Sequence, residues 1–139
     1  MTTDGSGKDV GYKASETIQI TDKMVRQFAE MSGDFNPIHL DDEYAKSTRF
    51  KKRIAHGMIL GALVSRFLNE KIGSGGIYLA QTLKFTNPVY IDDMITFDFE
   101  IMKLHKTRGF GIVETIAKNS SGEVVMKGEA TIMMSWGVK

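Results

Sequence analysis

Asp34 and His39 are the residues of this sequence whose types and spacing best suit acid–base chemistry. Five residues along a regular α-helix turn a side chain by about 500°, which would point these two side chains apart. Pro37 lies between them and disfavours a helical conformation at Asn36, so we predict a bent loop that can bring them together. A carboxylate and an imidazole, with ordinary pKa values near ~3.9 and ~6.5, could then share a water molecule. This pair alone leaves open that Asp34 only caps local amides and that His39 only stabilises the next helix start.

The dipeptide His56-Gly57 could add a hydrogen-bond donor to this chemistry. Gly57 begins a segment that we predict to be a buried helix, and the first amides of a helix lack internal partners and lie at its positive end. With no side chain in the way, the N–H of Gly57 could stabilise an oxygen that develops negative charge. Gly57 could also be a close-packing residue or an N-terminal cap. Such a donor favours Asp34 and His39 as a catalytic pair.

The composition excludes several other kinds of chemistry. The chain has 139 residues, no cysteine and three histidines, and its 18 Lys and Arg against 17 Asp and Glu give a net charge of +1. The lack of cysteine removes disulfides, thiolate nucleophiles, iron–sulfur clusters and Cys-based zinc sites. A net charge so close to zero gives no electrostatic reason to expect a nucleic-acid partner. The histidines are therefore the main acid–base candidates at neutral pH.

Hydrophobic periodicity predicts the elements that must position these residues. A short strand over 14–20 is followed by a helix, because apolar residues recur at helical spacing over 24–31. Thr21 is suited to cap the start of this helix, and Gly33 is suited to end it in a left-handed conformation. Residues 33–40 are then predicted to form a shaped loop.

Beyond that loop, Asp41 is predicted to cap a short helix through about Lys46. The segment from Gly57 to Lys71 is apolar on nearly every side, so we expect a helix that is buried all round. A small domain buries such a helix most simply by curling a sheet around it. Turn residues over 73–76 precede the strands of that sheet, which are predicted at about 77–85, 95–101, 110–118 and 123–136.

These elements predict a single α+β domain over residues 9–139, with a mostly antiparallel sheet wrapped around the long helix. Residues 1–8 are predicted to be a flexible N-terminal tail. The chain begins without the basic and apolar regions of a secretory signal, and its longest apolar stretch is too short to cross a membrane. We therefore expect a cytoplasmic protein with no membrane partner.

Three segments of the sequence resemble the MaoC-like (R)-specific enoyl-CoA hydratases. They are SGDFNPIHLDDEYA over 32–45, AHGMILGALVS over 55–65 and IYLAQTLKFTNPVYIDD over 77–93. The resemblance implies the hot-dog fold, a homodimer, and reversible hydration of trans-2-enoyl-CoA to (R)-3-hydroxyacyl-CoA, which is the reaction of a hydro-lyase. It also implies an acyl-CoA thioester as the substrate and no metal or redox cofactor.

The resemblance further implies roles for individual residues. Asp34 and His39 match the catalytic pair that holds the water added to the double bond. Asn36 matches a supporting polar residue of the same loop, and Gly57 matches the backbone donor to the thioester carbonyl. Ser65 matches a serine often found in the active-site region of the long helix.

The remaining histidines and a short basic run have less specific interpretations. His56 could support Gly57 or face the substrate channel, and His105 is expected to be a solvated residue near a turn. Lys51, Lys52 and Arg53 are expected to form a solvated loop, although they could also meet the phosphates of coenzyme A.

Three alternatives remain open from the sequence. The same chemistry could act on acyl-carrier-protein thioesters, as in a (R)-3-hydroxyacyl-[acyl-carrier-protein] dehydratase. The same fold could serve an acyl-CoA thioesterase, in which the water attacks the carbonyl. A non-catalytic thioester-binding module is disfavoured, because such a module has no need to keep Asp34, His39 and Gly57 together.

Overall fold

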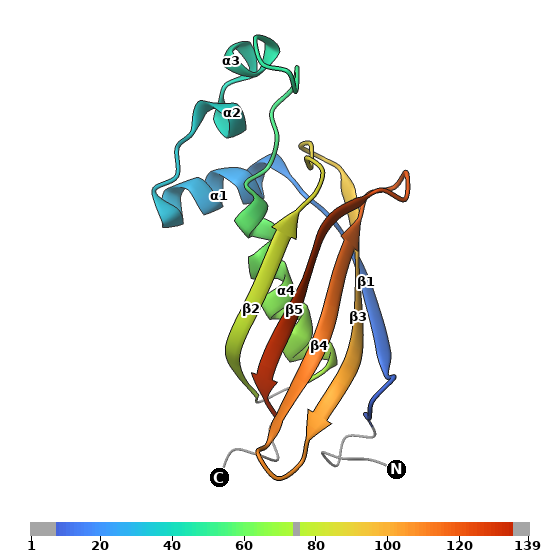
Figure 1. The fold of residues 1–139 in the computed structure, drawn as a ribbon. Coiled ribbons are helices and arrows are strands. Elements are labelled where there is room, and N and C mark those ends of the chain that lie inside the picture. Colours follow the sequence, from blue (N-terminus) through green and yellow to red (C-terminus); the bar gives the residue numbers. More distant parts are fainter. Residues whose placement is uncertain (1–7, 74–75, 135–139) are drawn as a thin grey trace.

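The computed structural model describes residues 8–73 and 76–134, which form one five-stranded antiparallel sheet and four helices (Figure 1). The spatial order of the strands is β1-β3-β4-β5-β2. The strands are β1 (Lys13–Gln19), β2 (Ile77–Phe85), β3 (Met94–His105), β4 (Phe110–Lys118) and β5 (Val124–Met133). The helices are α1 (Asp22–Ser32), α2 (Pro37–Leu40), α3 (Asp42–Lys46) and α4 (Gly57–Lys71). The predicted α+β architecture is confirmed.

The core lies between the concave face of the sheet and α4 (Figure 1). Strand β3 alternates as predicted, so that every second side chain points at the helix and is buried. The Phe67 ring of α4 meets the rings of Phe97 and Phe99 at centroid distances of 5.4 and 6.5 Å. Burying a side chain of this size contributes about 1.5–3 kcal/mol to stability. These contacts hold α4 in a fixed position under the sheet.

Helix α4 is buried on one side only, so the prediction that it is buried all round was wrong. Met58 is 54% exposed, and Ala62 and Ser65 are also exposed. The sheet curls around one face of α4 and leaves the opposite face to a partial cover by α1 (Figure 1). The edge strand β2 has the same character, because its apolar residues Ile77 and Leu79 are about half exposed.

Helix α1 begins and ends at the residues that the sequence predicts. The Thr21 hydroxyl accepts a hydrogen bond from the Met24 amide at 3.2 Å. Gly33 has a φ of 80° and donates its N–H to the Ala29 carbonyl at 2.8 Å. This left-handed residue turns the chain out of the helix and into the loop that carries Asp34.

The segment predicted as a loop over 33–40 contains one helical turn, α2. The Asn36 side chain caps this turn by accepting a hydrogen bond from the Ile38 amide at 3.1 Å. Pro37 occupies the first helical position, where its fixed φ is favourable and its missing N–H costs nothing. Gly33 therefore ends one helical segment and Pro37 starts the next, whereas the prediction used Pro37 only as a residue that disfavours a helix at Asn36.

Some predicted features fall outside the described residues. They are residues 1–7 of the tail predicted over 1–8, the middle of the turn over 73–76 and the end of the last predicted strand at Trp136. Within the described part of the chain, no helix has the length and apolar character needed to span a membrane.

Candidate active site

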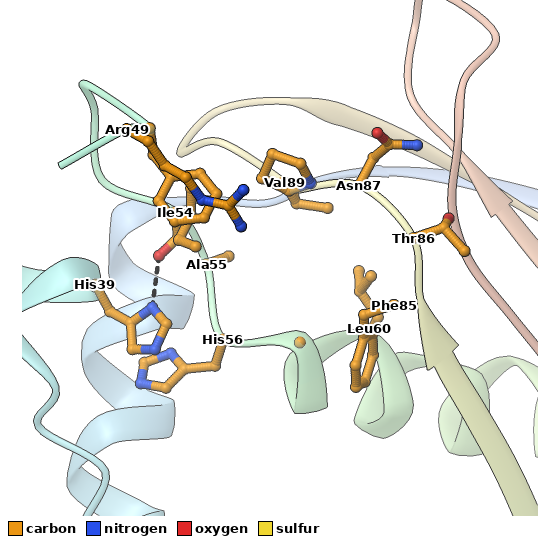
Figure 2. Close-up of a pocket in the computed structure, with 13 residues that line it drawn as sticks. His39, Arg49, Ile54, Ala55, His56, Leu60, Phe85, Thr86, Asn87 and Val89 are labelled. Carbon is orange, nitrogen blue, oxygen red and sulfur yellow. Dashed lines mark hydrogen bonds between the residues drawn. The ribbon is translucent and has the colours of Figure 1, made fainter. Parts of the chain in front are cut away.

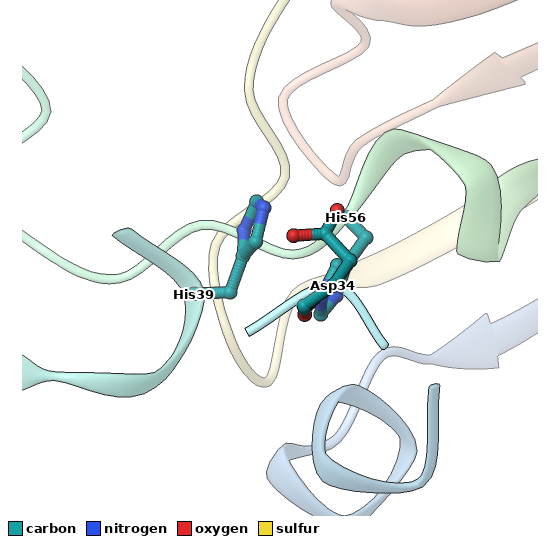
Figure 3. A group of neighbouring side chains, drawn as sticks. All are labelled: Asp34, His39 and His56. Atoms are coloured by element: carbon teal, nitrogen blue, oxygen red, sulfur yellow. Dashed lines mark hydrogen bonds between the residues drawn. The ribbon is translucent and has the colours of Figure 1, made fainter. Parts of the chain in front are cut away.

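Three side chains from separate elements meet at the N-terminal end of α4 (Figure 3). Asp34 lies in the loop after α1, His39 lies in α2, and His56 directly precedes α4. One carboxylate oxygen and one ring nitrogen from each histidine lie within 4.8 Å of one another. The bend at Gly33 and the turn of α2 thus place the Asp34 carboxylate beside the His39 ring, which a continuous helix would not do.

His39 has one ring nitrogen bound and one free. Its Nδ1 lies 2.7 Å from the Ile54 carbonyl oxygen, and because a carbonyl can only accept, Nδ1 must donate (Figure 2). The neutral ring therefore carries its lone pair on Nε2. Burial lowers the pKa of His39, and nearby His56 lowers it further, while the hydrogen bond to Ile54 and the Asp34 charge act in the opposite direction. The net shift favours a neutral imidazole, which can accept a proton.

Asp34 is exposed, and both its backbone amide and its backbone carbonyl form hydrogen bonds. Its amide donates to the Ser32 hydroxyl at 3.1 Å, and its carbonyl accepts from His56 Nε2 at 3.0 Å. Its Oδ1 accepts from the Asn36 amide at 3.2 Å. A carboxylate has further lone pairs beyond that one contact, so it can still hold a water molecule.

His56 is buried to 3% exposure and contacts both members of the pair. Its ring stacks on the His39 ring with a centroid distance of 3.9 Å and an interplanar angle of 30°. Because Nε2 donates to the Asp34 carbonyl, Nδ1 carries the lone pair, and Nδ1 has no hydrogen-bond partner among the described residues. The sequence predicted that His56 supports Gly57 or faces the substrate channel, but it did not predict these contacts with Asp34 and His39.

The two histidines and Asp34 are a residue set that could ligate a metal ion. A metal ion lies in the plane of each coordinating imidazole, at about 2.0–2.1 Å from the nitrogen. The rings of His39 and His56 are stacked with a centroid distance of 3.9 Å, so an ion in the plane of one ring would lie out of the plane of the other. The arrangement suits acid–base chemistry on a water molecule better than metal binding.

A cavity of about 300 Å³ opens beside the histidines (Figure 2). His39 and His56 lie at one end of it, and Leu60 and Phe85 lie at the other. Gly57 is the first residue of α4 and lines the cavity. The first hydrogen bond at this end of the helix runs from the Ile59 amide to the His56 carbonyl, so it does not use the Gly57 amide. The Gly57 amide is therefore one of the unpaired donors at a helix N-terminus.

Gly57 also allows close packing, the alternative left open by the sequence. A Cβ at this position would lie 3.0 Å from the Phe85 ring. The two roles are compatible, because the packing concerns the missing side chain and the donor is the backbone amide.

Asn36 and Ser65 lie apart from this cavity. Asn36 is exposed and its side chain caps α2, so in this structure it shapes the loop. Ser65 lies two turns along α4 from Gly57 and lines a separate hollow with Tyr78 and Ile132. Within the described chain, Ser65 is therefore not brought together with Asp34 and His39.

Arg53 is buried to 8% exposure, so the prediction of a solvated loop was wrong for this residue. Its Nε donates to the His39 carbonyl at 3.0 Å, and its Nη2 forms an ion pair with Asp22. Lys51 and Lys52 are exposed as predicted. Arg53 and Ala55 are both buried and lie two residues apart in an extended segment, so their side chains lie on the same side of it. This spacing was the signal available in the sequence.

His105 is the last residue of β3, and the strand register places it level with Ile77 at the start of β2, whereas the cavity is lined by Phe85 at the end of β2. It is half-buried against the Phe110 ring, with a centroid distance of 4.5 Å, and is less solvated than predicted.

The fold and the site together define a hot-dog domain with an acid–base pair beside the N-terminus of its central helix. Residues 6–125 match the family described as MaoC like domain, and the chain belongs to this family. The hot-dog fold predicted from the resemblance is thereby confirmed.

Relatives of known activity match nearly the whole chain. The (R)-specific enoyl-CoA hydratase of Aeromonas caviae is 35% identical over 127 residues, which cover 91% of this chain and 95% of that protein. The enzyme of the same name from Rhodospirillum rubrum is 38% identical over 125 residues, with coverage of 89% and 86%. A mitochondrial 3-hydroxyacyl-[acyl-carrier-protein] dehydratase of Arabidopsis thaliana is 34% identical, with coverage of 90% and 76%.

Solved structures of (R)-hydratases are also similar to this chain over nearly its whole length. An R-hydratase from Pseudomonas aeruginosa, solved in an unliganded form, superposes with a TM-score of 0.88 at 40% identity, over 95% of this chain and 85% of that one. The A. caviae (R)-hydratase involved in PHA biosynthesis superposes with a TM-score of 0.89 at 35% identity, over 93% and 98%.

Proposed function

We propose that this protein is an (R)-specific enoyl-CoA hydratase, a hydro-lyase that reversibly adds water to trans-2-enoyl-CoA thioesters. The observation that carries the proposal is the His39 ring, which has a free Nε2, lies beside the Asp34 carboxylate and lines a cavity together with Gly57. The relatives named (R)-specific enoyl-CoA hydratase support the choice of reaction.

The proposed chemistry uses three groups of this chain. A water molecule is held between Asp34 and His39, and one of them takes a proton from it while its oxygen bonds to C3 of the substrate. The electrons of the double bond move toward the thioester oxygen, where the Gly57 N–H stabilises the enolate-like charge. A proton then reaches C2 from the pair, so that one water is added and no redox cofactor takes part. The reverse sequence removes water from the (R)-3-hydroxyacyl thioester.

His56 positions this pair in the proposed mechanism. It holds the Asp34 backbone by a hydrogen bond and stacks on the His39 ring. Asn36 supports the same loop by capping α2. Ser65 remains a prediction as an active-site residue, since its hollow lies apart from the cavity.

Variants of the pair test the proposed function directly. We expect Asp34→Asn and His39→Ala each to lower the rate of crotonyl-CoA hydration by about 10²- to 10⁴-fold, the usual contribution of a positioned proton-transfer group. The loss of enoyl absorbance measures the rate, and circular dichroism checks the fold. Asp98→Asn in β3 and His105→Ala are matched controls far from the cavity. Near-normal rates in either active-site variant would refute the assignment.

A second candidate is dehydration of 3-hydroxyacyl groups on acyl carrier protein, which the A. thaliana relative favours by its name. The chemistry at Asp34 and His39 would be identical, so only the carrier differs. Side-by-side kcat/KM values on crotonyl-CoA and on the crotonyl thioester of acyl carrier protein distinguish the two. A strong preference for the protein carrier would favour the second candidate.

The proposal includes a cytoplasmic homodimer that needs no metal. The exposed apolar residues of the edge strand β2 support a homodimer, because an exposed edge strand with apolar side chains tends to pair with another chain.

A further inference from the structure

The extended segment from Arg53 to His56 is bonded along its length to the loop and turn that carry the proposed catalytic pair. The Ile54 amide donates to the Ile38 carbonyl at 3.2 Å, and the Ile54 carbonyl accepts from His39 Nδ1 at 2.7 Å. His56 Nε2 donates to the Asp34 carbonyl at 3.0 Å. On its other side, the segment is fixed by the Ala55 amide, which donates to the Val89 carbonyl at 2.7 Å. The segment is thus a rigid support for the turn of α2.

Arg53 supplies the bond that this support makes to the His39 backbone. Its Nε donates to the His39 carbonyl at 3.0 Å, while its Nη2 pairs with Asp22 in the first turn of α1. The exposed carboxylate of Asp42 lies 3.9 Å from Nε and adds little, because solvent screens it. A planar guanidinium donates in two fixed directions at once, which a lysine ammonium does not. Arg53 therefore links α1 to α2 through one rigid group.

The turn of α2 needs such a link. It has four residues, and a helix that short has no stability of its own in water. Its position then depends on contacts made by other elements, and the ring of His39 can reach the Ile54 carbonyl only while the His39 backbone stays in place.

We propose that Arg53 is a positioning residue for His39: by holding its carbonyl, Arg53 keeps Nδ1 bonded to Ile54 and Nε2 free as the base. This role rests on the proposed function, because it assigns Arg53 to the same site. Without the bond from Arg53, the His39 ring leaves the Ile54 carbonyl, and the tautomer protonated at Nε2 becomes populated. That tautomer cannot take a proton from the water at Nε2.

The test compares Arg53→Lys with Asp22→Asn. Lysine keeps the charge but carries it on a single ammonium nitrogen. We expect this nitrogen to pair with Asp22 and to leave the His39 carbonyl unbonded. Asp22→Asn removes the ion pair and keeps the Nε bond to His39. For crotonyl-CoA hydration, we expect Arg53→Lys to lower kcat by about tenfold or more while KM changes less than about threefold, and Asp22→Asn to stay within about threefold of the wild type. Thermal unfolding monitors the stability of both variants.

The tautomer of His39 is a readout that a purely structural role would not change. Nitrogen-15 NMR of the imidazole should show Nδ1–H in the wild type and in Asp22→Asn, and a mixture with Nε2–H in Arg53→Lys. If Arg53→Lys does not fold, the double variant Arg53→Gln, Asp22→Asn takes its place in both measurements. The double variant removes both charges of the ion pair, so it leaves no buried charge unpaired.

Two results would overturn the inference. The first is a folded Arg53→Lys protein with the wild-type kcat and tautomer. The second is an equal loss of kcat in Arg53→Lys and Asp22→Asn with the tautomer unchanged, which would mean that Arg53 only stabilises the fold. If the wild type does not hydrate crotonyl-CoA but the tautomer changes as expected, the proposed function fails and the positioning of His39 by Arg53 stands.

Discussion

The protonation state of His39 decides whether the proposed base is ready at neutral pH. Burial and the neighbouring His56 lower its pKa below the ordinary value of 6.5. The Ile54 carbonyl selects the tautomer that leaves Nε2 free. Backbone contacts therefore prepare this side chain before any substrate binds.

The first prediction concerns the pH dependence of the reaction. Because the folded-state pKa of His39 is lowered, the neutral form is already the major form at pH 6.5 and is lost as the pH falls through the lowered pKa. We expect kcat/KM for crotonyl-CoA to reach a plateau by neutral pH and to decline on the acid side with a midpoint below pH 6.5. An acid limb with its midpoint above pH 6.5 would contradict this expectation.

A His56→Gln variant is the control for the assignment of that limb. Glutamine can keep a donor to the Asp34 carbonyl but removes the second imidazole. Since His56 lowers the pKa of His39, the limb should persist and move to higher pH. Loss of the limb would instead identify His56 as the group that titrates.

Sequence reasoning predicted that Asp34 and His39 lie close together, but it did not predict the contacts that Arg53 and His56 make with them. The first two residues lie in one loop, whose bend follows from a nearby glycine and proline. The burial of Arg53 depends on Asp22, far earlier in the chain, and on a backbone carbonyl. Such contacts between distant segments leave no local pattern in the sequence, apart from the two-residue spacing of Arg53 and the apolar Ala55.

At the scale of elements, α4 must approach β2 closely in order to present its N-terminus to the cavity. Gly57 and Gly61 make this possible, because a Cβ would lie 3.0 Å from the Phe85 ring at Gly57 and 2.9 Å from Leu83 Cδ1 at Gly61. The two glycines lie one turn apart on the face of α4 that meets β2. Of the two, only Gly57 lines the cavity.

The second prediction uses these glycines as a matched pair. Gly57→Ala and Gly61→Ala both press a methyl group against β2, which should cost about 1–3 kcal/mol of stability in each. If the Gly57 amide contacts the thioester oxygen, Gly57→Ala should lower kcat by about tenfold more than Gly61→Ala, because it also displaces that amide. Thermal unfolding and crotonyl-CoA kinetics measure the two effects. Equal kcat values in the two variants would argue against the oxyanion role of Gly57.

Local signals predicted the elements well wherever one residue decides a boundary. Thr21 and Gly33 define the ends of α1 through a side-chain cap and a left-handed φ of 80°. The α2 turn was missed, because Pro37 can stop a helix or start one, and the Asn36 cap decides between these outcomes. The one-sided burial of α4 was also missed, because it depends on how far the sheet curls.

At the scale of the whole molecule, the edge strand β2 exposes the apolar side chains of Ile77, Leu79 and Phe85, and α4 exposes that of Met58. Leu79 is 51% exposed in β2, and Met58 is 54% exposed in α4. An exposed edge strand with apolar side chains tends to pair with another chain. This surface is where we place the second copy in the proposed homodimer.

The third prediction tests that placement. Leu79→Lys puts a charge on β2 and should shift the protein from dimer to monomer, as measured by size-exclusion chromatography with light scattering. Met102→Lys is a matched control, because Met102 is an exposed apolar residue of β3, an interior strand of the sheet. A dimer unaffected by Leu79→Lys would mean that the copies do not meet at β2.

With Asp34 and His39 as the proton-transfer pair, the protein should add water to the double bond of an enoyl-CoA with (R) stereochemistry. Incubation of the wild-type protein with crotonyl-CoA tests this when the enoyl absorbance and free thiol are followed together and the configuration of the product is determined. We expect loss of enoyl absorbance, formation of (R)-3-hydroxybutyryl-CoA and no release of coenzyme A. Release of coenzyme A before the absorbance falls, or formation of the (S) product, would contradict this prediction.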